Sequence, residues 1–298
     1  MSNPRHSQGP GAAAALGYFD GVHIGHAEVL SAAVRHGDTA AAVTFGRLPK
    51  KSSGRILTES VRNRRIRGLG INEIITLDFE QVRDYSPEAF IRFLKAKLGI
   101  KFVSCGYDFR FGKNALGDAA LLTKLCLKED MRPLVLEPVL FGEEPVSSTN
   151  IRRRLEAGDI SAVNKMLSLP YEFDFTVSVG DRRGRTWGFP TINQVYGEDF
   201  ALPKFGVYAS KVFVDGKWRA GVTNIGTRPM FRADKPLAET YIPNFDGDLY
   251  GRNIPVRLYK YLRGEKKFSS DQTLREEIAK NVKESEKLAC HSVKDMIE

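Results

Sequence analysis

The sequence predicts two domains of different class: an N-terminal α/β domain with a parallel sheet covered by helices on both faces, and a small C-terminal antiparallel β-barrel followed by a helix. The first half alternates short apolar runs with segments of helical periodicity. The second half alternates apolar and polar residues between closely spaced turn residues. The length of 298 residues suits about two domains. We place the boundary after residue 168, so that the expected domains are 1–168 and 169–298.

Five buried strands are expected in the first domain, each a short apolar run. They cover residues 12–16, 40–45, 73–77, 102–105 and 134–136. One helix is expected after residue 26, another at 58–69, and a third from Ser86-Pro87 to Gly99. Proline suits the first helical position, and glycine suits the left-handed position after the last turn. Because ligands bind beyond the carboxyl ends of parallel strands, a site is expected in the loops that follow them.

The second domain is expected to be a barrel of short strands. They cover residues 173–179, 207–214, 218–224, 239–242 and 254–262. Turn residues such as Asp215-Gly216 and Gly264 separate them. A closing helix begins near Asp271, and its apolar residues lie on one face: Leu274, Ile278 and Val282.

The composition excludes a disordered chain and favours a reduced, cytoplasmic protein. Hydrophobic residues make up 42% of the sequence, which is enough for packed cores. No apolar run reaches the ~18 residues of a membrane-spanning helix, and we expect no signal peptide in residues 1–11. The 3 cysteines are an odd number without metal-site spacing. The sequence leaves the oligomeric state open.

The formal charge of +9 is compatible with a nucleic-acid-binding surface or with sites for small anions. Arginines cluster at residues 62–65, 152–154 and 182–185. Two of these three clusters fall in motifs described below. We therefore expect phosphate-containing small molecules as ligands, with no nucleic-acid or membrane partner.

The stretch Gly17-Tyr18-Phe19-Asp20-Gly21-Val22-His23-Ile24-Gly25-His26 connects the first strand to the first helix. His23 and His26 share one face at a helix start, and Gly25 between them lets another molecule approach closely. Free N–H groups at a helix start favour an anion, and two imidazoles can stabilise charge that develops on phosphate oxygens. Taken alone, these histidines are also compatible with a metal site or an ordinary turn.

Two further segments of the first half carry polar residues at element ends. The loop Gly106-Tyr107-Asp108-Phe109-Arg110-Phe111-Gly112-Lys113 follows a strand, and its aromatic residues are also compatible with a core role. Ser147-Ser148-Thr149-Asn150-Ile151-Arg152 begins a helix. Its hydroxyls are normal capping residues, but together with Arg152 they are suited to phosphate oxygens.

In order and approximate spacing, these three segments resemble the FMN adenylyltransferase module of bacterial bifunctional riboflavin kinase/FAD synthetases, over roughly residues 12–168. That module is a Rossmann-like nucleotidyltransferase domain. The resemblance implies that His23 and His26 contact the ATP phosphates, with no zinc. It also implies that Gly17, Phe19, Asp20 and Gly25 of the first segment help to bind the triphosphate, and that Asn114 and Asp118 lie near the flavin. Ser148, Thr149 and Arg152 would close over the phosphates.

Residues 44–49 depart from the pattern of that family. The family usually has Thr-Phe-Asp-Pro-His-Pro, whereas this chain has Thr-Phe-Gly-Arg-Leu-Pro. The acid and the histidine are both missing, and Arg47 is a candidate to contact phosphate in their place. An alternative therefore stays open, in which the N-terminal module is a weak adenylyltransferase or acts on a changed substrate.

The second half concentrates glycines and arginines in residues 180–188, just before Phe189-Pro190-Thr191-Ile192-Asn193. Such a segment can wrap a polyphosphate, although it is not a P-loop. Thr191 and Asn193 lie on one face of an extended segment and offer oxygen ligands that suit Mg²⁺. A glycine-rich turn that enters a strand is the plain alternative.

This segment resembles the Gly-x-x-x-Gly-Arg-x-x-Gly-Phe-Pro-Thr-x-Asn motif of riboflavin kinases, and the resemblance extends over nearly all of residues 171–280. It implies Glu239 as the base for the riboflavin 5′-hydroxyl and Arg263 near the flavin and the transferred phosphate. Met230 replaces a threonine that is usual in the family. The implied ATP-binding residues are Gly180, Gly184, Arg185, Gly188, Pro190, Thr191 and Asn193, the last two with Mg²⁺.

Together the two resemblances predict a bifunctional enzyme of flavin cofactor synthesis. Its C-terminal domain would transfer phosphate from ATP to riboflavin, giving FMN and ADP. Its N-terminal domain would convert FMN and ATP to FAD and pyrophosphate. A basic nucleic-acid-binding protein without catalysis is an alternative of another class, which the presence of Thr191, Asn193 and Glu239 disfavours.

Overall fold

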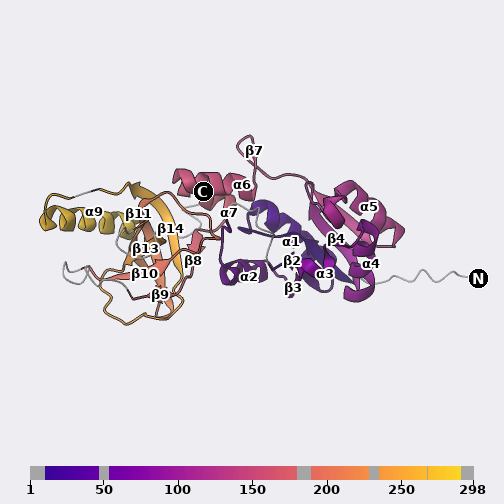
Figure 1. Ribbon diagram of the computed structural model, residues 1–298, viewed down its shortest axis with the longest axis horizontal. Helices are drawn as coiled ribbons and strands as arrows, with labels where there is room; N and C mark the ends of the chain where they lie inside the picture. The colour runs from indigo at the N-terminus through magenta and orange to yellow at the C-terminus, as the bar shows by residue number, and fades with distance from the viewer. Residues whose placement is uncertain (1–10, 47–53, 180–188, 228–234, 267, 290–298) are drawn as a thin grey trace, which may run out of the picture. The chain divides into compact units, whose positions relative to one another are not determined.

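The computed structural model describes residues 11–46, 54–179, 189–227, 235–266 and 268–289 of the chain (Figure 1). The chain forms two compact units, residues 1–52 with 62–146, and residues 53–61 with 147–298. The chain thus leaves the first unit after residue 52, returns to it at residue 62, and leaves it again after residue 146. The functional boundary between residues 168 and 169 stays a prediction.

The first unit contains a five-stranded parallel sheet in the order β3-β2-β1-β4-β5. This confirms the predicted parallel α/β architecture. In β1, the residues Ala13, Ala14 and Ala15 are fully buried, as is usual for a parallel strand covered on both faces. The strands are β1 Ala12–Leu16, β2 Ala40–Phe45, β3 Glu73–Leu77, β4 Ile100–Gly106 and β5 Arg132–Leu136.

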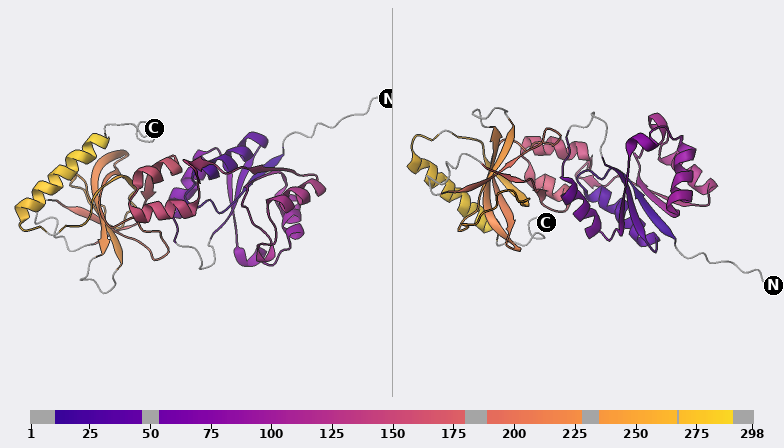
Figure 2. Two further views of the ribbon diagram at one scale, coloured as in Figure 1. Left: turned by 90° about the horizontal axis from the view of Figure 1, so that it is seen from above. Right: turned by 60° about the horizontal axis from the view of Figure 1, so that its bottom comes forward.

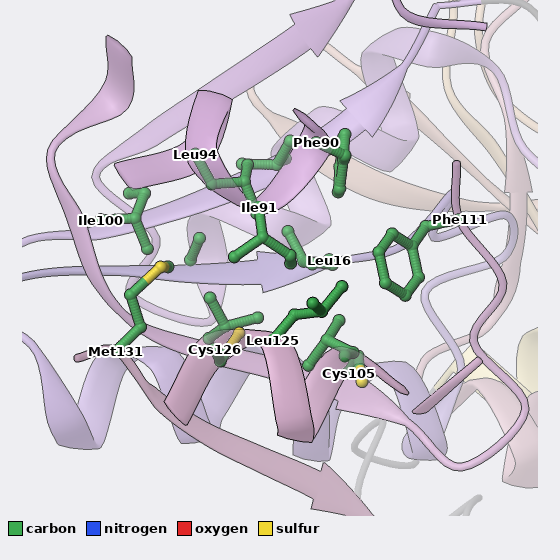
Figure 3. Close-up of a cluster of buried hydrophobic side chains, with 14 of the residues drawn as sticks. Leu16, Phe90, Ile91, Leu94, Ile100, Cys105, Phe111, Leu125, Cys126 and Met131 are labelled. Carbon is green, nitrogen blue, oxygen red and sulfur yellow. The ribbon is translucent and has the colours of Figure 1, made fainter. Parts of the chain in front are cut away.

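Helices cover both faces of this sheet. On one face, Ser104 Oγ of β4 donates to the carbonyl of Val29 in α1, at 2.8 Å. Its neighbours Val103 and Cys105 point to the other face, where they pack with α4 and α5 (Figure 3). The helices of this part of the chain are α1 Ile24–His36, α2 Glu59–Gly68, α3 Phe79–Val82, α4 Pro87–Leu98, the 3₁₀ turn η1 Lys113–Ala115 and α5 Ala119–Lys128.

The predicted limits of α4 follow from local chemistry. Ser86 is the N-cap residue, and its Oγ accepts a hydrogen bond from the N–H of Ala89 at 3.2 Å. Gly99 ends the helix with a φ of 66°, a left-handed conformation that glycine adopts readily because it has no Cβ. Cys105 and Cys126 are free thiols in the adjoining core, where burial raises the pKa of both to about 12. Both thiols are therefore neutral and unreactive at pH 7.

The second unit contains a seven-stranded antiparallel sheet in the order β8-β14-β11-β12-β13-β10-β9. The sheet curls, so that the N–H of Val177 in the edge strand β9 donates to the carbonyl of Arg252, just before β14, at 2.9 Å. The predicted antiparallel barrel is thus a curled half-barrel. The strands are β8 Tyr171–Phe173, β9 Val177–Ser178, β10 Thr191–Val195, β11 Gly206–Val214, β12 Lys217–Thr227, β13 Pro236–Tyr241 and β14 Val256–Arg263.

The prediction of a single strand at residues 173–179 is wrong. The structure has two strands here, β8 and β9, which lie at opposite edges of the sheet. Between them, the buried carboxylate of Asp174 accepts hydrogen bonds from Thr58 Oγ1 and Ser60 Oγ, both at 2.5 Å. Nearby, the N–H of Arg55 donates to the carbonyl of Asp199 at 2.7 Å. The segment 54–61 is therefore built into the second unit through side-chain and backbone hydrogen bonds.

In the described part of residues 147–298 there are three helices, and the last of them packs on β11 and β12 (Figure 2). They are α6 Ser148–Ala157, α7 Ile160–Leu167 and α9 Asp271–Ala289. The expected apolar face of α9 is only half-buried, and Asn281 and Ser285 are the most deeply buried of the α9 residues whose side chains the structure describes.

Two further features complete the described chain. A short hairpin, β6 Leu140–Phe141 and β7 Glu144–Pro145, precedes α6. Among the residues that the structure describes, no helix combines the length and the apolar character needed to cross a membrane.

Candidate active sites

The turn between β1 and α1 has a strained backbone. Phe19 and Val22 have φ values of 56° and 47°, and Gly21 between them has a φ of 85°. A positive φ is rare for a β-branched residue such as Val22, and strain of this kind concentrates at functional sites. The hydroxyl of Thr44 in β2 donates to the carbonyl of Tyr18 at 3.2 Å and so holds the turn against the sheet.

The turn presents the two predicted histidines as a stack. Their ring centroids are 3.6 Å apart, and the rings are inclined by only 16°. His23 is the N-cap residue of α1, and its Nδ1 accepts a hydrogen bond from the N–H of His26 at 3.2 Å. A Cβ atom at Gly25 would lie 3.3 Å from the His23 ring, so glycine leaves room for this ring. The N–H groups of Ile24 and Gly25, at the first two helical positions, have no partner within the helix.

Both imidazoles are neutral at physiological pH. Burial lowers the pKa of His23 from 6.5 to about 4. Burial, and then the neighbouring His23, lower the pKa of His26 well below its usual value. Because His23 Nδ1 is an acceptor, its other ring nitrogen carries the proton and can donate to an anion. His26 Nδ1 is buried without a hydrogen-bond partner among the described residues.

The lowered pKa of His23 predicts a pH-dependent stability. The unfolded chain binds the proton at a pKa of 6.5 and the native state only at about 4. The stabilisation is therefore complete above pH 6.5 and is lost as the pH falls towards 4, a difference of about 3 kcal/mol. NMR titration of ¹³C-labelled histidines gives the pKa directly, and urea unfolding at pH 7 and 4.5 gives the stability. Between pH 7 and 4.5, the His23→Gln variant should lose less free energy of unfolding than the unchanged protein. A His23 that titrates near 6.5 in the native state would contradict the prediction.

A cavity of about 670 Å³ lies in the first unit, and aromatic rings line it. Phe109 and Phe111 stack with centroids 5.9 Å apart, and Phe45 meets Phe79 edge to face at 6.0 Å. Phe45 is the last residue of β2, so the cavity borders the carboxyl edge of the sheet, where parallel sheets bind ligands. Charged and polar residues complete the lining: Arg83, Asp84, Arg110, Lys113 and Asn114.

The loop after β4 forms one wall of this cavity. Phe111 and Gly117 exchange two backbone hydrogen bonds of 3.0 and 2.9 Å, which close the loop on itself. Asn114 lines the cavity, with a φ of 56° in the left-handed region. Asp118 does not line the cavity; its carboxylate is the N-cap of α5 and accepts from the N–H of Leu121 at 2.8 Å.

The predicted phosphate-binding hydroxyls stand at the start of α6, in the second unit. Ser147 has the capping role, since its Oγ accepts from the N–H of Asn150 at 3.2 Å. Ser148 is half-buried and Thr149 is exposed in the first helical turn. Arg152, one turn further along, donates from Nη1 to the carbonyl of Gly54 at 3.3 Å.

The sheet of the second unit aligns the predicted kinase residues in one row. Asn193 of β10 is paired with Glu239 of β13, and Glu239 is paired with Asn224 of β12. Asn224 is paired in turn with Val207 of β11, and Val207 with Arg263 of β14. Directly paired residues point to the same face of an antiparallel sheet. The candidate residues therefore form a transverse polar row, interrupted by Val207.

The end of this row at β10 is suited to a cation. Asn193 is only 6% exposed, and its Oδ1 is buried without a hydrogen-bond partner among the described residues. Such an oxygen is costly to bury unless a ligand satisfies it. Thr191 lies two residues earlier on the same strand and therefore faces the same side. This pair of oxygens fits a hard cation such as Mg²⁺.

The other end of the row is a fixed guanidinium. Arg263 donates from Nε to Asn281 Oδ1 at 3.2 Å, and the same nitrogen lies 3.0 Å from Glu277 Oε1. Its Nη1 donates to the carbonyl of Gly264 at 3.2 Å, and the group lies 5.5 Å from the centre of the Phe268 ring.

Several predicted residues lie outside the described residues: Gly180, Gly184, Arg185 and Gly188, together with Arg47 and Met230. Pro190 is described and is exposed at the entry to β10. Beside it, Phe189 meets Tyr241 edge to face with a centroid distance of 5.2 Å.

Sequence reasoning missed several residues of these sites. Phe79 belongs to the four-residue helix α3, whose only sequence signal is the capping residue Asp78. Asn224 ends the strand expected at residues 218–224, but its place in the polar row depends on strand register. Glu277 and Asn281 are polar residues on the buried side of an amphipathic helix, and nothing in the sequence pattern marks them.

The two units define an α/β nucleotidyltransferase and a small β-sheet kinase in one chain. A family model described as FAD synthetase matches residues 5–150, and one described as riboflavin kinase matches residues 167–289. The bifunctional riboflavin kinase/FMN adenylyltransferase of Listeria monocytogenes is 33% identical over 282 residues, covering 90% of this chain and 89% of the relative. The chain belongs to the family of bifunctional riboflavin kinase/FMN adenylyltransferases.

Two further comparisons extend over similar lengths. The bifunctional riboflavin kinase/FMN adenylyltransferase of Bacillus subtilis is 33% identical over 290 residues, covering 91% of this chain and 90% of the relative. A crystal structure described as a macrolide-efflux protein from Streptococcus pneumoniae has a TM-score of 0.83 at 25% identity, and covers 96% of this chain and 95% of that one.

Proposed function

We propose that this protein makes FMN from riboflavin and ATP, and FAD from FMN and a second ATP. The observation that carries the proposal is the presence of one catalytic arrangement in each compact unit. The first unit has the stacked pair His23 and His26 together with an aromatic cavity. The second unit has the row of Asn193, Glu239 and Arg263 across its sheet.

For riboflavin phosphorylation, Glu239 accepts the proton of the 5′-hydroxyl as that oxygen forms its bond to the γ-phosphorus of ATP. The bond from this phosphorus to the bridging oxygen breaks, and ADP leaves. Thr191 and Asn193 would hold Mg²⁺, which supplies charge neutralisation on the phosphates when it is bound. Arg263 stands at the opposite end of the row and orients the flavin.

For adenylyl transfer, a phosphate oxygen of FMN attacks the α-phosphorus of ATP, and pyrophosphate leaves. The attacking group comes from FMN, so no protein nucleophile is required. His23 and His26 donate hydrogen bonds to phosphate oxygens on which charge increases. The free N–H groups at the start of α1 add to this stabilisation. Ser148, Thr149 and Arg152, which belong to the second unit, stay predicted phosphate ligands, since hydroxyls and a guanidinium suit phosphate oxygens.

The cavity of the first unit is the proposed site of the flavin ring. Its volume of about 670 Å³ is within the usual range of ligand cavities, and its aromatic walls suit a planar heterocycle. The lining carries Arg83, Arg110 and Lys113 against one carboxylate, Asp84, whose Oδ1 lies 3.0 Å from Lys113 Nζ. The remaining positive charge favours FMN over uncharged riboflavin. We further propose a cytoplasmic location, since ATP is the co-substrate and the described cysteines are free thiols.

Phe109→Ala is expected to weaken FMN binding in the first unit. The substitution removes one ring of the Phe109–Phe111 stack, and we expect the KM for FMN in adenylylation to rise about tenfold. Riboflavin phosphorylation should keep its KM and kcat. Tyr107→Ala is the matched control, because Tyr107 lies in the same loop, is 47% exposed and does not line the cavity. An equal increase of the KM for FMN in both variants would argue against the cavity as the flavin site.

The whole proposal is tested by incubating the protein with Mg²⁺ and ATP, in one tube with riboflavin and in another with FMN, and separating the flavins by chromatography. FAD in both tubes would support both activities. FMN in the first tube without FAD in either would favour the alternative, in which the departure at residues 46–48 disables or redirects the adenylyltransferase. No flavin product in either tube would overturn the proposal.

A further inference from the structure

The guanidinium of Arg263 is held from outside its own strand. Two of its partners, Glu277 and Asn281, lie on α9, four residues apart and therefore on the same face of the helix. The distances from Arg263 Nε are 3.0 Å to Glu277 Oε1 and 3.2 Å to Asn281 Oδ1. The Arg263 side chain is 13% exposed and that of Glu277 is 23% exposed, so this ion pair is shielded from most of the solvent.

The position of α9 on the sheet is itself fixed by directional contacts. Ser285, one turn after Asn281, donates from Oγ to the carbonyl of Ser210 at 3.0 Å and lies 2.6 Å from the carbonyl of Gly221. These two carbonyls belong to β11 and β12. Hydrogen bonds fix the rotation and register of a helix more closely than apolar contact does. The helix therefore carries Glu277 to a defined place beside Arg263.

The order of residues along the polar row assigns Arg263 to one substrate. The oxygens suited to Mg²⁺–ATP, at Asn193, lie on one side of Glu239. Arg263 lies on the other side, beyond Asn224 and Val207. Since Glu239 receives the riboflavin proton, the side away from ATP is the flavin side. A group that orients Arg263 is thus expected to affect riboflavin and not ATP.

We propose that Glu277, assisted by Asn281, is a positioning residue of the riboflavin kinase site that fixes Arg263 for contact with the flavin. The proposal rests on the assignment of Arg263 to the flavin in the proposed function. Glu277 and Asn281 bind Nε of Arg263, and the carbonyl of Gly264 accepts from Nη1. We assign the third nitrogen, Nη2, to the contact with the flavin. Lys266, whose Nζ lies 4.0 Å from Glu277 Oε1, is more exposed and contributes a weaker second charge to the same carboxylate.

A double-mutant cycle tests this proposal. Glu277→Gln keeps the shape of the side chain and removes its charge, and we expect the KM for riboflavin to rise about fivefold with the KM for ATP unchanged. In an Arg263→Ala background, the same substitution should have no further effect, because the group that it positions is absent. Glu277→Asp should recover part of the loss. Initial rates of FMN formation at varied riboflavin and varied ATP give all of these constants.

The controls separate positioning from a structural role. Glu284→Gln removes another carboxylate of α9, whose cation partners are Lys260 and Lys287, and it should leave both KM values unchanged. Adenylylation of supplied FMN checks that each variant is folded. A Glu277→Gln effect that persists in full without Arg263, or one that raises the KM for ATP equally, would overturn the positioning role. An Arg263→Ala variant with a normal KM for riboflavin would instead overturn the assignment of Arg263 to the flavin.

Discussion

His26→Ala is expected to abolish FAD formation from FMN and to leave FMN formation from riboflavin intact. The His26 ring stacks on His23 at 3.6 Å, and its Nδ1 is buried without a hydrogen-bond partner among the described residues. The substitution removes a donor from the position where charge develops on phosphate, which typically costs a factor of about 10² to 10³ in kcat. Loss of the stack also leaves the His23 ring without its neighbour, so we expect a decrease in kcat near the upper end of this range. Chromatography of the flavins formed from each substrate gives both rates.

His36 provides a matched control for this experiment. It lies on the same helix, it also stacks on an aromatic ring, Phe102 at 4.5 Å, and its Nδ1 is 2.8 Å from the carbonyl of Ala32. His36→Gln should therefore alter stability at most and keep FAD formation. If His26→Ala also stopped riboflavin phosphorylation in a folded protein, the assignment of the two activities to separate units would be wrong.

The second large effect is expected from Glu239→Gln, which should stop FMN formation and leave FAD formation from supplied FMN unchanged. The amide keeps the shape of the side chain in its place between Asn193 and Asn224 but cannot accept the hydroxyl proton. Loss of a general base typically costs a factor of about 10² to 10⁴. The rate of phosphorylation is measured at saturating riboflavin and ATP, so that the change refers to kcat.

Glu198→Gln is the control for Glu239. The Glu198 side chain is 85% exposed and its carboxylate lies 3.6 Å from Lys235 Nζ, so its loss should change neither rate. Rapid FMN formation by Glu239→Gln would mean that another group takes the proton. Loss of FAD formation from supplied FMN would mean that Glu239 supports the fold or the other site.

Local sequence signals predicted the five strands of the first unit and the helices α1, α2 and α4 closely, but they did not predict α3 or α5. The runs at residues 12–16, 40–45 and 73–77 are strands with the predicted limits, and Ser86 and Gly99 delimit α4. These features depend on neighbouring residues alone. The prediction failed at residues 173–179, because the break between β8 and β9 depends on hydrogen bonds from Thr58 and Ser60, which are more than 110 residues away.

The sites show the same division between local and distant causes. The stack of His23 and His26 follows from a spacing of three at a helix start, and so could be predicted. The pairing of Asn193, Glu239 and Arg263 depends on the register of separate strands, which alternation alone does not set. The walls of the cavity come from β2, α3, α4 and the loop after β4, which only the folded chain brings together.

The segment 54–61 has a consequence for genetic dissection of the two activities. A gene cut after residue 146 would separate most of the first unit but would also take away Thr58 and Ser60. The Asp174 carboxylate would then stay in the C-terminal fragment without the two hydroxyls that satisfy it, and an unsatisfied buried charge is strongly destabilising. Neither unit is a contiguous stretch of the chain, so a C-terminal fragment made to test the kinase alone should keep residues 53–61.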